Sequence, residues 1–151
     1  TGVAYLCATL LTCLLVEESG VRDWILRWGP AVFVMTIIFV ASSTPGPGLP
    51  DLGAWDFLAK KSAHMLGFAL LAIAYFRGLD KGENVTTAQF VTALGMAFVY
   101  AIADEFHQRF TPGRTPSIQD VGIDTLGAAL GLTIRCGMKT SALIAAPQPT
   151  R

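Results

Sequence analysis

Long apolar stretches, separated by short polar segments, dominate the chain. No Asp, Glu, Lys or Arg occurs in residues 28–50, 62–76 or 84–103. A helix that crosses a bilayer needs about 20 consecutive, mainly apolar residues. The pattern therefore predicts an all-α fold, a polytopic membrane bundle of four transmembrane helices. The expected helices cover about 23–43, 57–77, 87–110 and, after Pro116, residues up to about 138.

The pattern predicts a transmembrane domain of residues 23–140, with a separate segment at each end of the chain. Residues 1–16 are also free of charge, but this length is marginal for a hydrocarbon core of about 30 Å. Residues 1–22 therefore form either a fifth transmembrane helix or a peripheral apolar segment, and both interpretations stay open. No signal peptide is expected, because a basic start and a small-residue cleavage site are missing. Residues 141–151 are expected to form a flexible tail.

Composition strengthens the membrane assignment. Of the 151 residues, 52% are hydrophobic and only 15% are charged, whereas a soluble domain carries roughly a quarter charged residues. The formal net charge is zero, so no nucleic-acid partner is expected. Cys7, Cys13 and Cys136 lie in apolar segments without metal-ligand spacing, and they are interpreted as small hydrophobic residues. The sequence therefore predicts no metal and no cofactor.

The basic residues suggest an orientation. In a serpentine bundle one membrane side carries Arg22, Arg27, Arg77, Lys81, Arg135 and Lys139, and the other carries Lys60, Lys61, Arg109 and Arg114. Basic residues favour the cytoplasmic side. The larger set is therefore expected in the cytoplasm, and the second set on the outer face of the membrane.

Polar residues gather at the outer ends of the expected helices. At ~1.5 Å per residue, His64, Asp104 and Asp124 each lie about 10 Å inside their helix ends. Residues four apart share a helix face, which relates Lys60 to His64, Asp104 to Gln108 and Asp120 to Asp124. Because ionisable side chains are costly in lipid, we expect them to point into the bundle. They therefore predict an outward-facing polar pocket.

Two roles stay open for this cluster. In the functional interpretation, His64, Asp104 and Glu105 are candidate catalytic residues that move protons. The full set of candidate ligand-binding residues is Lys61, His64, Asp104, Glu105, Gln108, Arg114 and Asp120. In the structural interpretation, the two acids only pair with Lys61 and Arg114. Neighbouring helical residues diverge by about 100°, so one acid is expected to bond inside the bundle while the other faces a cavity.

Small residues and one local motif predict how the helices meet. Gly127 and Gly131 are spaced for close helix packing, and Gly67 and Gly95 are expected to act likewise. The segment from Ser117 to Asp120 resembles a capping box at the start of the fourth helix. These features are interpreted as structural.

Several motifs together carry a family resemblance. They are the turn Ser42-Ser43-Thr44-Pro45-Gly46-Pro47, the pair Lys61-x-x-His64, the segment Tyr100-Ala101-x-x-Asp104-Glu105-x-x-Gln108-x-Phe110-x-Pro112-Gly113-Arg114, and Asp120 followed by Gly127 and Gly131. With them, residues from about 28 to 131 resemble the VanZ-like family of small bacterial membrane proteins. Two positions depart from the family pattern: Lys60 stands where the family usually has an acid, and Asp124 where it usually has Asn.

The resemblance implies a multi-pass protein of the bacterial cell (inner) membrane, in contact with membrane lipids. The founding member of the family is associated with low-level resistance to teicoplanin, a lipoglycopeptide that targets cell-wall precursors. We therefore expect the pocket to bind or modify a lipid-linked cell-envelope component, such as a cell-wall precursor or phospholipid. The lipoglycopeptide itself is a further candidate partner. The alternatives are a membrane acyl- or phosphoryl-transferase and a non-catalytic assembly protein.

Overall fold

The structure, a computed structural model, describes the backbone of residues 2–45, 54–80, 82 and 84–145, and side chains within 20–45, 58–80, 82 and 84–142. Its helices are α1 (Gly2–Ser43), α2 (Ala54–Leu79), α3 (Thr87–Gln108) and α4 (Ile118–Ala145). The described residues contain no strand, so the all-α prediction is confirmed. The Pro-Gly turn beyond residue 45 and residues 146–151 of the expected tail lie outside the described residues.

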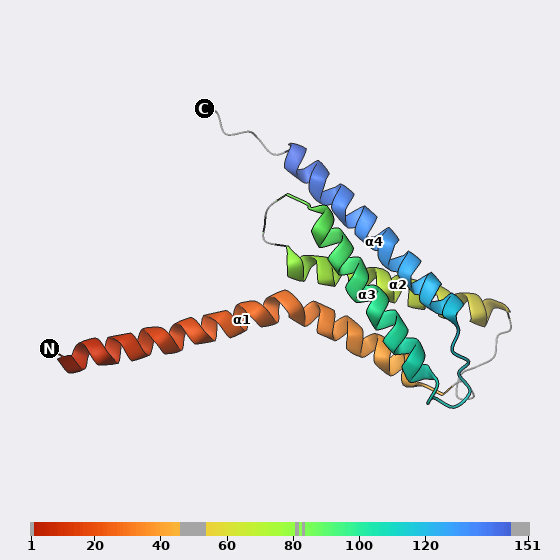
Figure 1. Cartoon of the computed structure of the whole chain (residues 1–151), viewed down its shortest axis with the longest axis horizontal. Coiled ribbons are helices and arrows are strands. Elements are labelled where there is room, and N and C mark those ends of the chain that lie inside the picture. Colours follow the sequence, from red (N-terminus) through yellow and green to blue (C-terminus); the bar gives the residue numbers. More distant parts are fainter. Residues whose placement is uncertain (1, 46–53, 81, 83, 146–151) are drawn as a thin grey trace.

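The first helix is longer than the sequence suggested. It runs without a break through the expected boundary at residues 22–23, so the backbone of residues 2–22 is continuous with the first spanning helix. Its first half extends away from the other three helices, and the helix bends near its middle (Figure 1). Pro30 lies inside it, where the missing N–H and the ring favour a kink. Whether residues 1–16 enter the membrane stays a prediction.

Four segments within the described residues are long and apolar enough to cross a membrane. They are Gly20–Ser43, Leu58–Leu79, Thr87–Gln108 and Ile118–Ala142. Large apolar side chains such as Phe33, Val99 and Ile134 remain exposed on the bundle's outer faces. An apolar surface of this extent would be a liability in water and suits contact with lipid. The chain is therefore a four-helix membrane bundle.

Helix α2 lies against each of the other helices and supplies most of the large core side chains, including Phe68, Leu71 and Phe76. Its closest partner is α4, because two glycines remove side chains from that contact. A Cβ on Gly127 would collide with the carbonyl oxygen of Met65, and one on Gly131 would lie 2.7 Å from the carbonyl oxygen of Ala69. The predicted close packing at these glycines is confirmed.

The other two glycines behave differently. A Cβ on Gly67 would meet Ile38 of α1 at an ordinary 3.4 Å, whereas one on Gly95 would meet nothing within 4 Å. The expectation for Gly95 was wrong, because this residue faces away from the neighbouring helices. Gly95 therefore makes no helix contact that a side chain would disturb.

The serpentine course of the chain determines where the polar residues lie. The carboxyl ends of α1 and α3 lie at the same end of the bundle as the amino ends of α2 and α4 (Figure 1). The opposite end is closed by different polar contacts, among them the ion pair of Lys139 with Asp80 and a hydrogen bond from Arg77 to the carbonyl oxygen of Leu26. Which end faces the cytoplasm stays a prediction.

Candidate functional site

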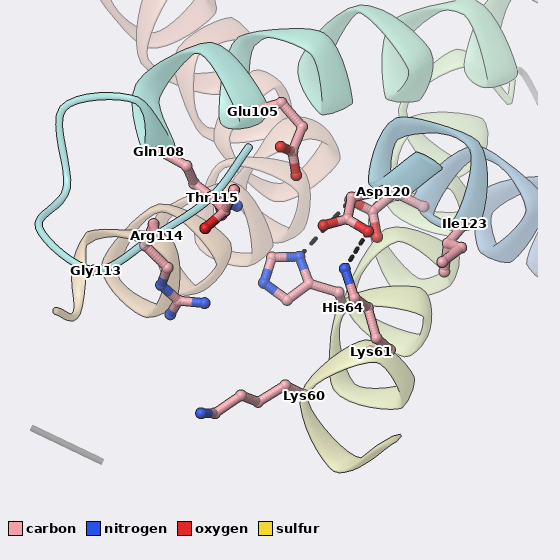
Figure 2. A pocket seen from close by; sticks show the side chains of 11 residues that line it. Lys60, Lys61, His64, Glu105, Gln108, Gly113, Arg114, Thr115, Asp120 and Ile123 are labelled. Atoms are coloured by element: carbon pink, nitrogen blue, oxygen red, sulfur yellow. Dashed lines mark ion pairs between the residues drawn. The ribbon is translucent and has the colours of Figure 1, made fainter. Parts of the chain in front are cut away.

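A polar pocket of about 240 Å³ lies at the end of the bundle where the predicted cluster converges. Six of the seven expected ligand-binding residues line it, namely Lys61, His64, Glu105, Gln108, Arg114 and Asp120 (Figure 2). Asp104 does not. Five further residues complete the lining: Lys60, Gly113, Thr115, Ile123 and Asp124. The i,i+4 spacing had already related Lys60 and Asp124 to the cluster, but neither was among the candidate ligand residues.

The amino ends of α2 and α4 are joined by an ion pair. Lys61 contacts Asp120, and their side chains are 27% and 19% exposed. An ion pair with this partial exposure is less screened than one on a fully solvated surface. The interaction therefore fixes one side of the pocket mouth while leaving both groups in reach of a ligand.

One helical turn deeper lies the pair of His64 and Asp124. Nδ1 of His64 is 3.7 Å from Oδ2 of Asp124, which is too long for a hydrogen bond. Asp124 is 1% exposed, and this Oδ2 atom has no hydrogen-bond partner among the described residues. The second ring nitrogen of His64 lies on the side of the ring that faces Arg114 (Figure 2). The carboxylate of Asp124 therefore lies beside the ring without a hydrogen bond to it, and the second ring nitrogen is placed to exchange a proton with a ligand in the pocket.

Arg114 links the pocket to the carboxyl end of α1. Its Nε donates to the carbonyl oxygen of Thr44 at 3.2 Å, and one terminal nitrogen donates to that of Ala41 at 2.9 Å. A cation suits the negative end of a helix dipole, and its donors satisfy carbonyl groups left open there. Figure 2 shows the guanidinium beside the pocket space, so part of its donor capacity can reach a ligand.

The two adjacent acids of α3 point in different directions, as the 100° divergence predicts. Asp104 is 3% exposed and accepts hydrogen bonds from the hydroxyl of Ser42 at 2.8 Å and from the amide of Gln108 at 2.9 Å. Glu105 faces the pocket and accepts a hydrogen bond from the backbone N–H of Ser117 at 2.9 Å. These partners differ from Lys61 and Arg114, which the structural interpretation had named.

The hydrogen bond between Glu105 and Ser117 replaces part of the capping box that was expected at the start of α4. In a capping box the side chain of Asp120 would accept from the N–H of Ser117. Here the side chain of Glu105 accepts the hydrogen bond from that N–H, while Asp120 forms an ion pair with Lys61. Ser117 still caps α4, because its hydroxyl accepts from the N–H of Gln119 at 3.1 Å. Helix α3 therefore supplies the acid that the start of α4 needs.

The pocket brings both signs of charge together. Lys60, Lys61 and Arg114 supply cations, and Glu105, Asp120 and Asp124 supply carboxylates. No three His, Cys, Asp or Glu side chains lie close enough to hold a metal ion in the part of the chain that the structure describes. The arrangement can bind an anion that also carries hydrogen-bond donors, and His64 can exchange a proton with it.

Fold and pocket define a class: a multi-pass membrane protein whose four-helix bundle carries a polar pocket at one end. More specifically, the chain belongs to the VanZ-like family, since the family model described as VanZ/LLP1 matches residues 3–139. The match includes most of the segment 1–22 that hydropathy alone had set apart. No curated protein and no solved structure matches the chain significantly.

Proposed function

We propose that this VanZ-like protein binds the anionic headgroup of a lipid-linked cell-envelope component in the pocket, on the outer side of a bacterial inner membrane. The observation that carries the proposal is the set of cations, Lys60, Lys61 and Arg114, around a pocket of about 240 Å³ at the helix ends. Lipid headgroups lie at this depth in a bilayer. A guanidinium can grip phosphate or carboxylate through two parallel hydrogen bonds.

The carboxylates of the pocket narrow the choice of ligand further. Glu105 and Asp120 line the same pocket as the cations, so a bare anion would meet repulsion as well as attraction. A headgroup with hydroxyl or amino groups next to its phosphate would satisfy both kinds of residue. Lys61 and Arg114 would hold the phosphate, and the acids would accept from the neighbouring donors. Phospholipids and lipid-linked cell-wall precursors both have this chemistry.

A binding measurement on purified protein tests the proposal. Arg114→Gln keeps a neutral donor near the α1 carbonyl groups and removes the charge. Arg22→Gln is the matched control. Arg22 lies in the middle of α1, away from the pocket, and its side chain is 74% exposed. In detergent micelles we expect phosphatidylglycerol to bind about 10- to 100-fold more weakly to Arg114→Gln, because a hydrogen bond to a charged group contributes about 1.5–3 kcal/mol. Equal affinity in both variants, with thermal stability preserved, would contradict the proposal.

The link to antibiotic resistance rests on the family and needs its own experiment. Expression of the protein in a susceptible Gram-positive host is expected to raise the teicoplanin concentration that inhibits growth. Arg114→Gln should remove this effect, and Arg22→Gln should keep it, with equal amounts of both variants in the membrane. An effect retained by Arg114→Gln would separate resistance from the pocket.

A second candidate, a transferase, is favoured by the pair of His64 and Asp124. A carboxylate on the Nδ1 side orients a histidine general base once the two are hydrogen-bonded, with the other nitrogen toward the substrate, and a shift of less than about 1 Å would close the 3.7 Å distance to that range. Purified protein incubated with phosphatidylglycerol would then transfer an acyl group from one lipid molecule to a headgroup hydroxyl of a second, which yields acyl-phosphatidylglycerol and lysophosphatidylglycerol, and His64→Gln would not. If mass spectrometry finds no modified lipid in either sample, the pocket is a binding site only.

A further inference from the structure

A second hollow lies on the lipid-facing side of the bundle, directly beside the polar pocket. It measures about 540 Å³ and runs between α3 and α4. Its apolar lining comes from Phe98, Ile102 and Phe106 of α3 and from Ile118, Val121 and Gly122 of α4. Most of these side chains are exposed, including Phe106 at 58% and Ile118 at 88%. We call this hollow the α3–α4 groove.

The groove and the pocket share a wall. Glu105 lines both, and its hydrogen bond to Ser117 closes the wall between them. In the connection between the helices, Thr115 lines the pocket while the next residue, Pro116, lines the groove. Only the carboxylate of Glu105 and the backbone of the connection therefore separate the charged pocket from the apolar groove. An amphiphile that lies across this connection would touch both.

The depth of the groove matches one leaflet of a bilayer. From Arg109 at its mouth to Phe98 at its inner end, the helix rises about 16 Å. The hydrocarbon core measures about 30 Å across two leaflets, so the groove is about as deep as one acyl chain is long. A polyprenyl chain, which is several times longer, would extend far beyond it. Length therefore favours a glycerophospholipid as the occupant.

Charge at the mouth supports the same occupant. Arg109 lines the groove there, and its guanidinium carbon lies 5.9 Å from the ring centroid of Phe106. A cation at the mouth of an apolar groove attracts an anionic lipid to this side of the bundle. Association within a bilayer gains little from the hydrophobic effect, because lipid tails are already in an apolar medium. The groove therefore selects an acyl chain by shape and position, and the basic residues of the groove mouth and the pocket attract the anionic headgroup.

We propose that the α3–α4 groove holds one acyl chain of an anionic glycerophospholipid whose phosphate occupies the polar pocket. The inference rests on the proposed function and names its ligand class. The lipid enters sideways from the outer leaflet, with its glycerol backbone over the connection that contains Thr115 and Pro116. The second acyl chain stays in the bilayer.

Two glycines of α4 give a matched pair of variants for the test. A Cβ on Gly122, inside the groove, meets nothing within 4 Å, and the same holds for Gly137, which does not line the groove. Gly122→Phe therefore fills the groove without displacing a neighbouring helix, and Gly137→Phe adds the same ring elsewhere on α4. Both variants should fold, since each removes a glycine from a helix.

Binding to detergent-solubilised protein is measured for phosphatidylglycerol, for its soluble headgroup analogue glycerol 3-phosphate and for undecaprenyl phosphate. Gly122→Phe should weaken phosphatidylglycerol binding by about tenfold or more and leave glycerol 3-phosphate binding unchanged. Gly137→Phe should change neither. Equal phosphatidylglycerol affinity in the two variants would overturn the inference, and so would tighter binding of undecaprenyl phosphate than of phosphatidylglycerol.

The pocket variant separates the two proposals. If Arg114→Gln weakens phosphatidylglycerol binding and Gly122→Phe does not, the groove assignment fails while the pocket remains a headgroup site. If neither variant changes binding, both proposals fail. Weakening by both variants, with the headgroup analogue sensitive only to Arg114→Gln, is the result that the inference expects.

Discussion

Ser42 donates its hydroxyl hydrogen to the carboxylate of Asp104 across 2.8 Å and ties the end of α1 to the end of α3. Both side chains are buried, at 0% and 3% exposure. Gln108 donates a second hydrogen bond to the same oxygen at 2.9 Å. Asp104 is the first acid after a charge-free run of apolar residues, and its contacts satisfy it inside the bundle. This arrangement favours a packing role over direct contact with a ligand.

Removing the hydroxyl should therefore destabilise the bundle. We expect Ser42→Ala to lower the free energy of unfolding by about 1–3 kcal/mol, because a buried carboxylate loses a donor. Thermal unfolding in detergent micelles measures the change. Thr36→Val is the control, since that hydroxyl bonds only to the carbonyl oxygen of Val32 in its own helix among the contacts observed. Equal melting temperatures for the two variants would show that the contact between Ser42 and Asp104 contributes little.

The ion pair of Lys61 and Asp120 separates a ligand role from a structural one. Single substitutions to Ala should each cost about 1–2 kcal/mol, given the partial exposure of both groups. The exchange Lys61→Asp with Asp120→Lys should restore most of that stability but not the binding of phosphatidylglycerol, because the cation moves to the other helix. If the exchanged protein binds lipid as well as the original, the charges serve assembly, as the non-catalytic alternative holds.

The sequence predicted the helices well where charge-free runs ended at turn residues. The first helix was expected to end at Ser43, and it does. Its start was placed too late, because acidic and basic residues near positions 17–23 interrupt the apolar pattern without interrupting the helix. Likewise α4 continues through Ala145, past the expected end near residue 138 and into the expected tail. Hydropathy predicts the part of a helix that contacts lipid, and the helix itself can extend beyond that part.

Six of the eleven residues that line the pocket were among the expected ligand-binding residues, but several of their partners were not predictable. Spacing of four residues placed Lys60, His64 and Asp124 on faces that converge. The partner of a polar group depends on how helices rotate and shift against one another, and sequence periodicity does not determine this. Ser42 as partner of Asp104, and the α1 carbonyl groups as partners of Arg114, therefore appear only in three dimensions.

The contact between α2 and α4 should tolerate no side chain at its glycines. A Cβ on Gly131 would lie 2.7 Å from the backbone oxygen of Ala69, so Gly131→Leu must push the helices apart. Overpacking of this kind costs about 1–3 kcal/mol or more. We expect a lower melting temperature and less folded protein in the membrane. Gly95→Leu is the control, since a Cβ there meets nothing within 4 Å, and a similar loss in it would contradict the packing argument.

Stability should also depend on pH through the opposite end of the bundle. Nζ of Lys139 lies 2.6 Å and 2.7 Å from the two carboxylate oxygens of Asp80, and the N–H of Gly82 donates to Asp80 at 2.9 Å. Asp80 follows the last residue of a membrane-spanning segment. Burial acts to raise the pKa of Asp80, but the hydrogen bonds from Lys139 and Gly82 outweigh it and hold the pKa below its usual 3.8.

A carboxyl group whose pKa is lower in the folded than in the unfolded protein binds fewer protons when folded. Its contribution is therefore complete well above the usual pKa of 3.8 and is lost as the pH falls through that value toward the folded pKa. Lys139→Met keeps the length of the side chain and removes the charge. We expect it to lower stability by about 1.5–3 kcal/mol at neutral pH and to reduce the loss of melting temperature between about pH 6 and pH 3. Lys139→Arg should keep the pH dependence. An unchanged pH profile in Lys139→Met would show that the ion pair does not link α4 to the end of α2.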